Sequence, residues 1–311
     1  MRISKLGLSS LLVVGLFSTQ LQAKYKFIAQ DRGQLSIIDE KGEVSSQMKL
    51  GGIHDIHQLN KNKFLTHQKT KVMEIDMSKK EIVWQFDCKK LYPKLKIEVH
   101  SFLPNDDGTV TVAVSGAGEI ITINREGEVL SKFSMKLNKP HPHKDTRLIR
   151  STPNGNILAS HEGDGFVREY TKSGELVWEY QVPMFGKESK RGHGVDAFGN
   201  SVFSSVRLKN GNTVICTGNG HSVIEVNPEK KIVWSLHQND LEGIQLAWVT
   251  TIEVLDNGNF LIGNCHAGEA NPQLIEVSRD KKVVWQYKNF ETFGNALSNS
   301  MVLNHSQAVT R

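Results

Sequence analysis

The sequence predicts an all-β fold, a six-bladed β-propeller of four-stranded antiparallel blades. Three observations predict it: a pair of strands joined by a polar turn recurs six times, the copies are about one blade apart, and Asn-Gly or Asp-Gly turns join the strands upstream. Four copies carry Trp at the same place in the second strand; they cover residues 74–86, 169–180, 225–236 and 276–287. Two degenerate copies, from Ile37 and Thr122, have Ser46 and Ser131 there.

The interval between copies sets the number of blades. Measured between the Trp or Ser positions, the copies lie 38, 47, 47, 56 and 51 residues apart. One four-stranded propeller blade takes about 40 to 50 residues. A seventh blade would have to fit between Trp178 and Trp234, and that interval is too short for another unit.

Blade 1 is incomplete at its own end of the chain. Only three strands are recognisable there: YKFIAQ from Tyr25, QLSIID from Gln34 and EVSSQMKL from Glu43. The segment ALSNSMVLN, from Ala296, lines up with the inner strand AWVTTIEVL of blade 6. We therefore expect the C-terminal strand to complete blade 1 and close the ring, which removes the unpaired edges that invite aggregation.

The five Trp residues fall into two groups. Trp84, Trp178, Trp234 and Trp285 repeat in outer strands, so we expect them to pack blade against blade. Trp248 starts the inner strand of blade 6, near the axis, where it can contact a ligand.

The N-terminus predicts export. Arg2 and Lys5 precede an apolar run over residues 6–17, which is too short to span a membrane. We interpret residues 1–23 as a secretory signal and residues 24–311 as a single propeller domain, a periplasmic or secreted protein without a membrane span and expected to be a monomer. The net charge of +5 is mild for 311 residues and does not indicate nucleic acid as a partner.

Three cysteines do not make a disulfide framework, and no CxxC spacing indicates zinc. Cys216 and Cys265 fall near the ends of equivalent strands in neighbouring blades. Two alternatives stay open, a disulfide between them or a pair of buried thiols acting as small apolar residues.

Polar residues gather on one face of the predicted disc. Ten of the 12 histidines lie in or beside the loops between the second and third strands and the crossovers between blades, which share a face. Each blade can thereby offer side chains to a common funnel at the axis. The residues that we expect to bind a ligand are His54, His100, His141, His143, Arg147, His193, Asn219, Trp248 and Asn264.

Some of these histidines have an alternative, structural interpretation as braces, which hydrogen-bond a crossover to the next strand. For His54 and His193 both the structural role and the ligand-binding role stay open. His161, His221 and His266 lie in Gly-rich loops at strand ends, so we treat them as catalytic candidates, acting as nucleophile or base. His141 and His143 are two residues apart and would point the same way in an extended segment, which makes them candidate metal ligands.

The loop over residues 183–200 is rich in Gly and charge. We expect it to be a mobile loop, and whether it is a lid over the funnel stays open.

The repeat resembles those of the PQQ-like and arylsulfotransferase-like propellers of the quinoprotein-dehydrogenase-like superfamily. The resemblance rests on inner strands led by His-Asp or His-Ser, on turns such as STPNGN and LDNGN, and on hairpins such as EVSRDKKVVWQY. It covers nearly all of the chain after residue 23 and implies the architecture more than an activity.

The resemblance bears on two activities of that superfamily. Quinone-dependent dehydrogenases are eight-bladed rings with calcium-bound PQQ; this sequence has too few blades and no acidic calcium cluster, so PQQ is not expected. Arylsulfotransferase-like proteins use a funnel His as the sulfate-carrying nucleophile, and no such motif matches here residue by residue.

Two functions follow. The favoured one is an exported propeller that binds a small anionic or carbohydrate ligand, or a protein partner, in the funnel. The alternative is a His-dependent enzyme, an arylsulfotransferase-like transferase, a lyase or a hydrolase, with or without a divalent metal. The sequence lacks a Ser-His-Asp elbow, a paired-carboxylate motif and HExxH, which favours binding.

Overall fold

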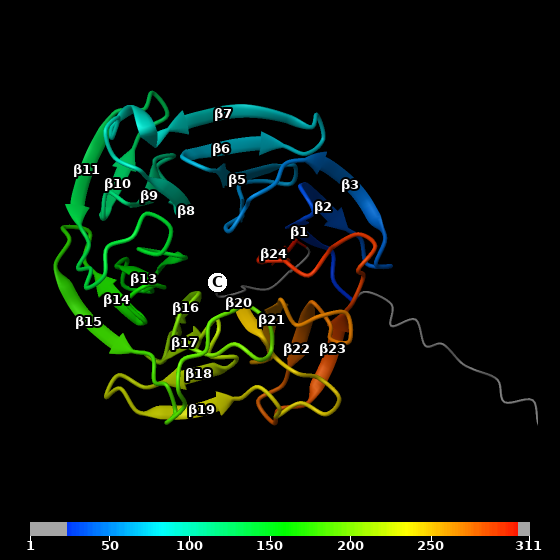
Figure 1. Ribbon diagram of the computed structural model, residues 1–311. Coiled ribbons are helices and arrows are strands. Elements are labelled where there is room, and N and C mark those ends of the chain that lie inside the picture. The colour runs from blue at the N-terminus through cyan, green and yellow to red at the C-terminus, as the bar shows by residue number, and fades with distance from the viewer. Residues whose placement is uncertain (1–23, 304–311) are drawn as a thin grey trace, which may run out of the picture.

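The computed structural model describes residues 24–303, and the predicted signal over residues 1–23 lies outside that range. Within it, 24 strands form six four-stranded antiparallel sheets that radiate from a common axis (Figure 1). The predicted six-bladed propeller is confirmed. The same range contains one 3-10 helix, η1 (Cys88–Lys90), and no helix that is long and apolar enough to cross a membrane.

The blades follow one another in chain order, each built outward from the axis. Blade 1 consists of β24 (Asn299–Val302), β1 (Phe27–Asp31), β2 (Gln34–Ile38) and β3 (Val44–Lys49). Blade 2 consists of β4 (His57–Gln58), β5 (Lys63–Gln68), β6 (Lys71–Asp76) and β7 (Glu81–Asp87). Blade 3 consists of β8 (Glu98–Pro104), β9 (Val110–Ser115), β10 (Glu119–Ile123) and β11 (Val129–Ser134).

The second half of the ring repeats this plan. Blade 4 consists of β12 (Ile149–Ser151), β13 (Ile157–His161), β14 (Phe166–Tyr170) and β15 (Leu176–Gln181). Blade 5 consists of β16 (Ser204–Arg207), β17 (Thr213–Cys216), β18 (Val223–Val226) and β19 (Ile232–Leu236). Blade 6 consists of β20 (Trp248–Val254), β21 (Phe260–Cys265), β22 (Leu274–Val277) and β23 (Val283–Tyr287).

The ring is closed by its last strand, as the sequence predicts. β24 pairs antiparallel with β1, placing Val302 opposite Phe27 and Asn299 opposite Gln30. In Figure 1 the red β24 lies beside the blue β1 at the axis. The first and last strands of the chain therefore share one sheet.

Each outer strand that carries Trp is joined to the next blade by a recurring contact. On blade 2, Glu74 of β6 lies opposite Trp84 of β7. Arg125 of blade 3 pairs with Glu74 at 3.0 Å and lies over the Trp84 ring at 4.6 Å, while the Trp84 Nε1 donates to the Arg125 carbonyl at 2.8 Å. The predicted packing of Trp against the neighbouring blade is confirmed. The parts played by the Glu carboxylate and the Arg cation were not predicted from the sequence.

The same Glu, Trp and Arg contact is made by Glu169, Trp178 and Arg207 and by Glu225, Trp234 and Arg279. A variant joins blade 6 to blade 1, where Lys24 pairs with Glu276 and the Tyr25 ring, instead of a cation, lies against Trp285. In every case the Glu lies opposite the Trp in the sheet register. We call this contact the blade joint.

A buried ion pair ties three blades together near the axis. Asp55, just before β4, accepts a hydrogen bond on each carboxylate oxygen from Arg150 of β12, both at 3.0 Å. The Ser101 hydroxyl of β8 donates to the same carboxylate. Burial raises the pKa of Asp55, but the charge of Arg150, together with His57, outweighs it, so the pKa lies well below its usual range.

The three cysteines are free and buried, so the disulfide alternative is wrong and the buried-thiol alternative is confirmed. Cys216 and Cys265 lie in different apolar clusters. Cys216 packs in an apolar cluster with Val214, whereas Cys265 packs in another cluster with Phe203 and Trp248. Burial raises the pKa of the Cys216 thiol to about 12.

We expect Asp55→Asn to lower the free energy of unfolding by about 3–5 kcal/mol, because it leaves the Arg150 guanidinium buried without a counter-charge. Urea denaturation measures the loss. The control Asp106→Asn, at an exposed turn, should change the free energy by less than about 0.5 kcal/mol. Equal effects of the two substitutions would contradict the role given to Asp55.

Candidate functional site

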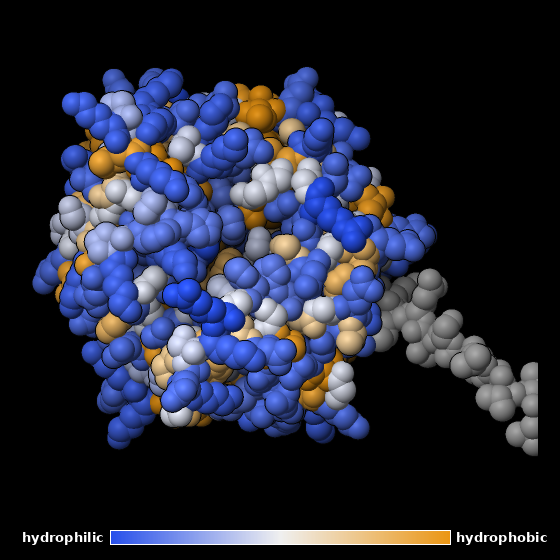
Figure 2. Space-filling model, in the orientation of Figure 1, coloured by the Kyte–Doolittle hydropathy of each residue, from blue (hydrophilic) through white to orange (hydrophobic). Residues whose placement is uncertain are grey.

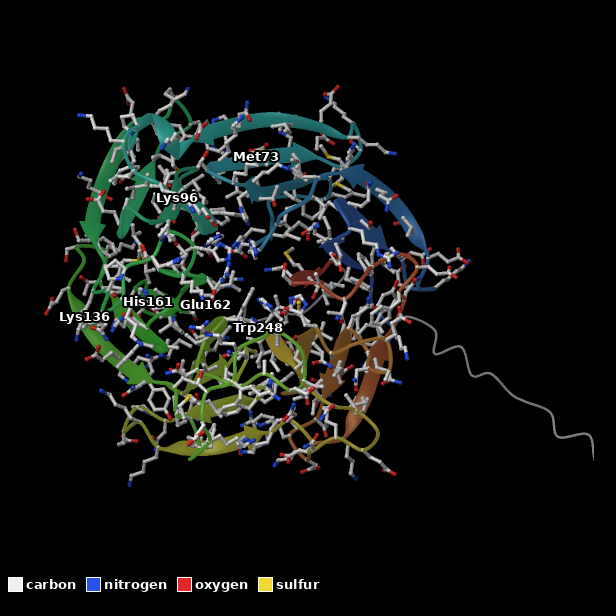
Figure 3. The ribbon with its side chains drawn as sticks, viewed as in Figure 1. Met73, Lys96, Lys136, His161, Glu162 and Trp248 are labelled. Atoms are coloured by element: carbon white, nitrogen blue, oxygen red, sulfur yellow. The ribbon has the colours of Figure 1, made fainter. Side chains whose placement is uncertain are left out.

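A pocket of about 800 Å³ lies at the axis, on the face formed by the crossovers and the loops between second and third strands. We call it the axial pocket. All six blades or their crossovers border the axis, and Figure 2 shows hydrophilic residues around the middle of the ring. In Figure 3, Glu162 and Trp248 lie near the centre, whereas Lys136 lies at the rim. The candidate residues that line the pocket are His54, His143, Arg147, His193, Asn219, Trp248 and His266.

Most of the charged residues in the wall of the axial pocket are cationic. Its Lys and Arg residues are Arg32, Lys144, Arg147, Lys190 and Arg191, against the carboxylates Asp31 and Glu162. Both carboxylates are engaged within the protein. Asp31 accepts from the backbone N–H groups of Arg32 and Ala296, at 2.6 and 2.9 Å, and Glu162 accepts from Arg147. The pocket therefore has an excess of positive charge.

Arg147 is the most buried cation of the pocket wall, with 5% of its surface exposed. Its Nε donates to Glu162, and its Nη2 donates to His143 Nε2 at 2.9 Å. Its Nη1 is buried and has no hydrogen-bond partner within residues 24–303. An unmet N–H of a buried charged group costs free energy unless a ligand or water satisfies it.

His54 and His67 stack on each other beside this arginine, with ring centroids 5.6 Å apart. The backbone N–H of His54 donates to His67 Nε2 at 2.7 Å, so a neutral His67 carries its proton on Nδ1. Neither the Nδ1 of His54 nor that of His67 has a partner in the described part of the chain. Burial, and then the charge of Arg147, hold the pKa of His54 well below its usual range, so His54 is neutral.

The Glu98 carboxylate lies between two further histidines. Its Oε2 is 3.0 Å from His100 Nε2 and 2.6 Å from His143 Nδ1. On its other side, His100 Nδ1 faces the Thr146 carbonyl at 3.2 Å. The hydrogen bond with His100 lowers the pKa of Glu98 to about 2, while burial lowers the pKa of His100. The three donor atoms of Glu98, His100 and His143 lie within 4.8 Å of one another.

The structure therefore pairs His143 with Glu98 and His100, and not with His141. His141 is exposed, and its Nδ1 accepts from the backbone N–H of His143 at 3.1 Å. The predicted pairing assumed an extended segment, but residues 142–144 form a turn in which Lys144 N–H donates to the His141 carbonyl at 2.9 Å. The group of possible metal ligands that contains His143 does not include His141. A spacing of two on β8, Glu98 and His100, is the signal that could have found the group.

A second aromatic group lines the opposite wall of the axial pocket. The His193 ring stacks on Trp248 at 5.0 Å and lies 5.1 Å from the ring of His266. His266 has φ of +60°, a left-handed conformation that is uncommon for a residue other than glycine. Burial, and then the charge of His193, lower the pKa of His266.

Two of the three catalytic candidates lie away from the axial pocket. His161 is fully buried, and its ring nitrogens contact the Asp145 carbonyl at 2.7 Å and the Tyr170 hydroxyl at 3.1 Å. The His221 ring lies between the carbonyls of Ala197 and Ala247. Both histidines are thus placed as braces between crossovers and sheets.

The two candidate asparagines also differ. Asn219 lines the pocket, and its Oδ1 accepts from Ser201 N–H at 2.9 Å. Asn264 is buried, accepts from Ala247 N–H at 2.8 Å and does not line the pocket. The loop over residues 183–200 contributes residues 189–193 to the wall, so it borders the pocket. Its mobility stays a prediction.

Sequence and structure comparisons place the chain among known propellers. The repeated blades define a PQQ-like β-propeller, and residues 31–287 match the family model described as outer membrane protein assembly factor BamB. The chain belongs to this family. A search of curated proteins finds no match.

Solved structures agree on the fold. A protein of unknown function from Bacteroides caccae is 25% identical, with a TM-score of 0.74 and coverage of 90% of this chain and 99% of its own. Virginiamycin B lyase from Staphylococcus aureus, in a catalytically inactive form with quinupristin, is 11% identical, with a TM-score of 0.57 and coverage of 87% and 86%. The second likeness shows the fold alone.

We expect the free energy of unfolding to fall as the pH drops from about 6.5 to about 4, by roughly 3 kcal/mol for His161 alone. Burial lowers the pKa of His161 to about 4, whereas an unfolded histidine titrates near 6.5. Between these values the unfolded chain binds more protons, so acid favours unfolding. Urea denaturation at several pH values in this range gives the free energy of unfolding at each pH. For His161→Gln this free energy should change less steeply with pH than for wild type. An unchanged pH dependence would contradict the buried neutral ring.

Proposed function

We propose that the protein is an exported propeller that binds a small anionic ligand in the axial pocket. The observation that carries the proposal is the buried guanidinium of Arg147, which lines the pocket and whose Nη1 lacks a hydrogen-bond partner in the described chain. A sulfate, phosphate or carboxylate oxygen would accept from that N–H. Hydrogen bonds between charged groups in a partly desolvated site are strong and directional, and Arg suits oxyanions in particular.

The surrounding charges support an anion over a neutral sugar. Four other cationic side chains, Arg32, Lys144, Lys190 and Arg191, line the pocket, and its two carboxylates are already engaged. The neutral ring of His54 adds a polar group without adding a negative charge. Walls of one sign raise the local concentration of oppositely charged ligands.

Export is the second part of the proposal. It rests on Arg2, Lys5 and the apolar run over residues 6–17, and it agrees with a family described by an outer-membrane assembly factor. A protein partner, the other occupant that the sequence leaves open, could present an acidic side chain or terminal carboxylate to the same cationic wall.

The test is a thermal-shift and calorimetric comparison of sulfate esters, phosphate esters and acidic sugars with neutral sugars. Anions should raise the melting temperature, because a ligand that binds the folded state stabilises it. Arg147→Lys keeps the positive charge but loses the planar guanidinium and its set of N–H donors. The Kd for the anion should therefore rise about 10-fold or more.

The matched control is Arg125→Lys, the same change at a blade joint of blade 3. It should leave the Kd unchanged even where it alters stability. Equal binding of neutral and acidic sugars, or equal losses in the two variants, would rule out anion recognition by Arg147.

Catalysis by His266 is a second candidate, favoured by its left-handed backbone and by its neutral ring against the pocket. Backbone strain at a non-glycine residue is often retained at functional sites. For an anion that the wild type binds and converts, His266→Gln should retain binding and lower turnover at least about 100-fold, as removal of a general base does. Mass spectrometry of the ligand after incubation measures this, and unchanged turnover would leave binding as the function.

A further inference from the structure

We propose that Glu98, His100 and His143 form a binding site for a divalent transition metal, zinc in the first place, on the edge of the axial pocket. One carboxylate and two imidazoles are a ligand set that zinc takes in proteins, and three protein ligands leave a fourth position open. The donor atoms lie within 4.8 Å of one another. They come from β8 and from the crossover that follows blade 3, so the ring itself brings them together.

The convergence of ligand atoms at Glu98 is the observation that points to a cation. Glu98 Oε2 lies 3.0 Å from His100 Nε2 and 2.6 Å from His143 Nδ1. A ring nitrogen from each of two histidines and a carboxylate oxygen therefore meet at one place, and each is an atom type that binds zinc. A bound metal ion would take the place of the protons in these two hydrogen bonds.

The surroundings of His100 match those of a metal ligand. Metal-binding histidines usually donate their other ring N–H to a carbonyl or carboxylate, which fixes the tautomer. The contact with Thr146 does this for His100. Zinc bonds of 2.0–2.2 Å require ligand atoms roughly 3.3 Å apart, so the present distances of 3.0 and 2.6 Å must widen by less than about 1 Å.

The site is open to solvent and able to adjust. The side chain of His143 is 44% exposed and that of Glu98 is 28% exposed, whereas that of His100 is 4% exposed. His143 borders the axial pocket, while Glu98 and His100 border a neighbouring pocket between blades 2 and 3. A buried, fixed ligand with two movable partners allows an ion to enter and the ligands to close on it.

Metal binding would change the role of Arg147. At present Arg147 Nη2 donates to His143 Nε2. A metal on His143 Nδ1 puts the ring proton on Nε2, so the Nε2–H of His143 and the Nη2–H of Arg147 face each other as two donors. Arg147 must then turn its Nη2 away, toward the adjacent wall of the axial pocket. Nη1 and Nη2 would both become available to an anion, so metal and anion should strengthen each other's binding.

The direct test is titration of Zn²⁺ into purified protein that has been stripped with EDTA and freed of the chelator, followed by calorimetry. Wild type should bind one equivalent, and Co²⁺ in its place should give the visible absorption of a low-symmetry site with nitrogen ligands. Glu98→Gln and His143→Ala should each weaken binding by roughly 100-fold or more, beyond the 10–100-fold cost of losing an outer-shell partner.

The matched control is His141→Ala, which removes an exposed imidazole two residues from His143. It should leave the zinc affinity unchanged. Circular dichroism of each variant confirms folding, and Glu98→Gln keeps the side-chain shape where a larger change would disturb the crossover. Absence of a one-equivalent site in wild type, or equal losses in His141→Ala and His143→Ala, would overturn the assignment.

The coupling to the anion is a separate measurement, and it alone rests on the proposed function. The Kd for zinc is determined with and without sulfate, and the Kd for sulfate with and without zinc. By linkage both should fall by the same factor. Zinc binding that sulfate does not affect supports the metal site and contradicts the movement of Arg147, whereas sulfate binding without zinc binding contradicts the metal site alone.

Discussion

The blade joint is the contact on which the rest of the structure depends. A Glu on the third strand of a blade lies opposite the Trp of the fourth strand, and the next blade supplies a cation that pairs with the Glu and lies over the Trp ring, as Arg125 does with Glu74 and Trp84. Each such contact contributes only about 0.5–1 kcal/mol where it is partly exposed. Its repetition on blades 2, 4, 5 and 6 ties the outer strands of successive sheets together.

The two blades without Trp show that the parts of the joint belong together. Ser46 lies opposite Ile37, and Ser131 lies opposite Thr122, so neither blade has the Glu where it lacks the Trp. These blades meet their neighbours through apolar contacts, such as Phe133 against Tyr170 at 5.7 Å. Carboxylate and indole are therefore present or absent as a unit, which is the behaviour of a single interaction rather than of two independent preferences.

The fold could be predicted almost completely because it depends on period and alternation. The spacing of Trp84, Trp178, Trp234 and Trp285, the turns and the orphan strand near Asn299 are all local patterns in the sequence. The face on which the histidines lie could be predicted too, because loop class alone assigns it.

The contacts of each histidine could not be predicted, because they depend on partners in other segments. His161 is held by the carbonyl of Asp145, and His143 meets a glutamate 45 residues away. The expectation that His141 and His143 point the same way assumed an extended segment, whereas residues 142–144 form a turn. The alternation of side chains within a strand depends on neighbouring residues alone. The position of a crossover against a sheet depends on residues far away in the sequence.

The position of β24 has a consequence for how the molecule folds. Blade 1 lacks its inner strand until β24 reaches it, so β1 keeps an unpaired edge until two segments far apart in the described chain meet. Such a non-local pairing pays its loop-closure entropy before any contact rewards it, which makes ring closure slow compared with the formation of a hairpin. Until closure, the open edge of β1 is a place where a strand of another chain can pair.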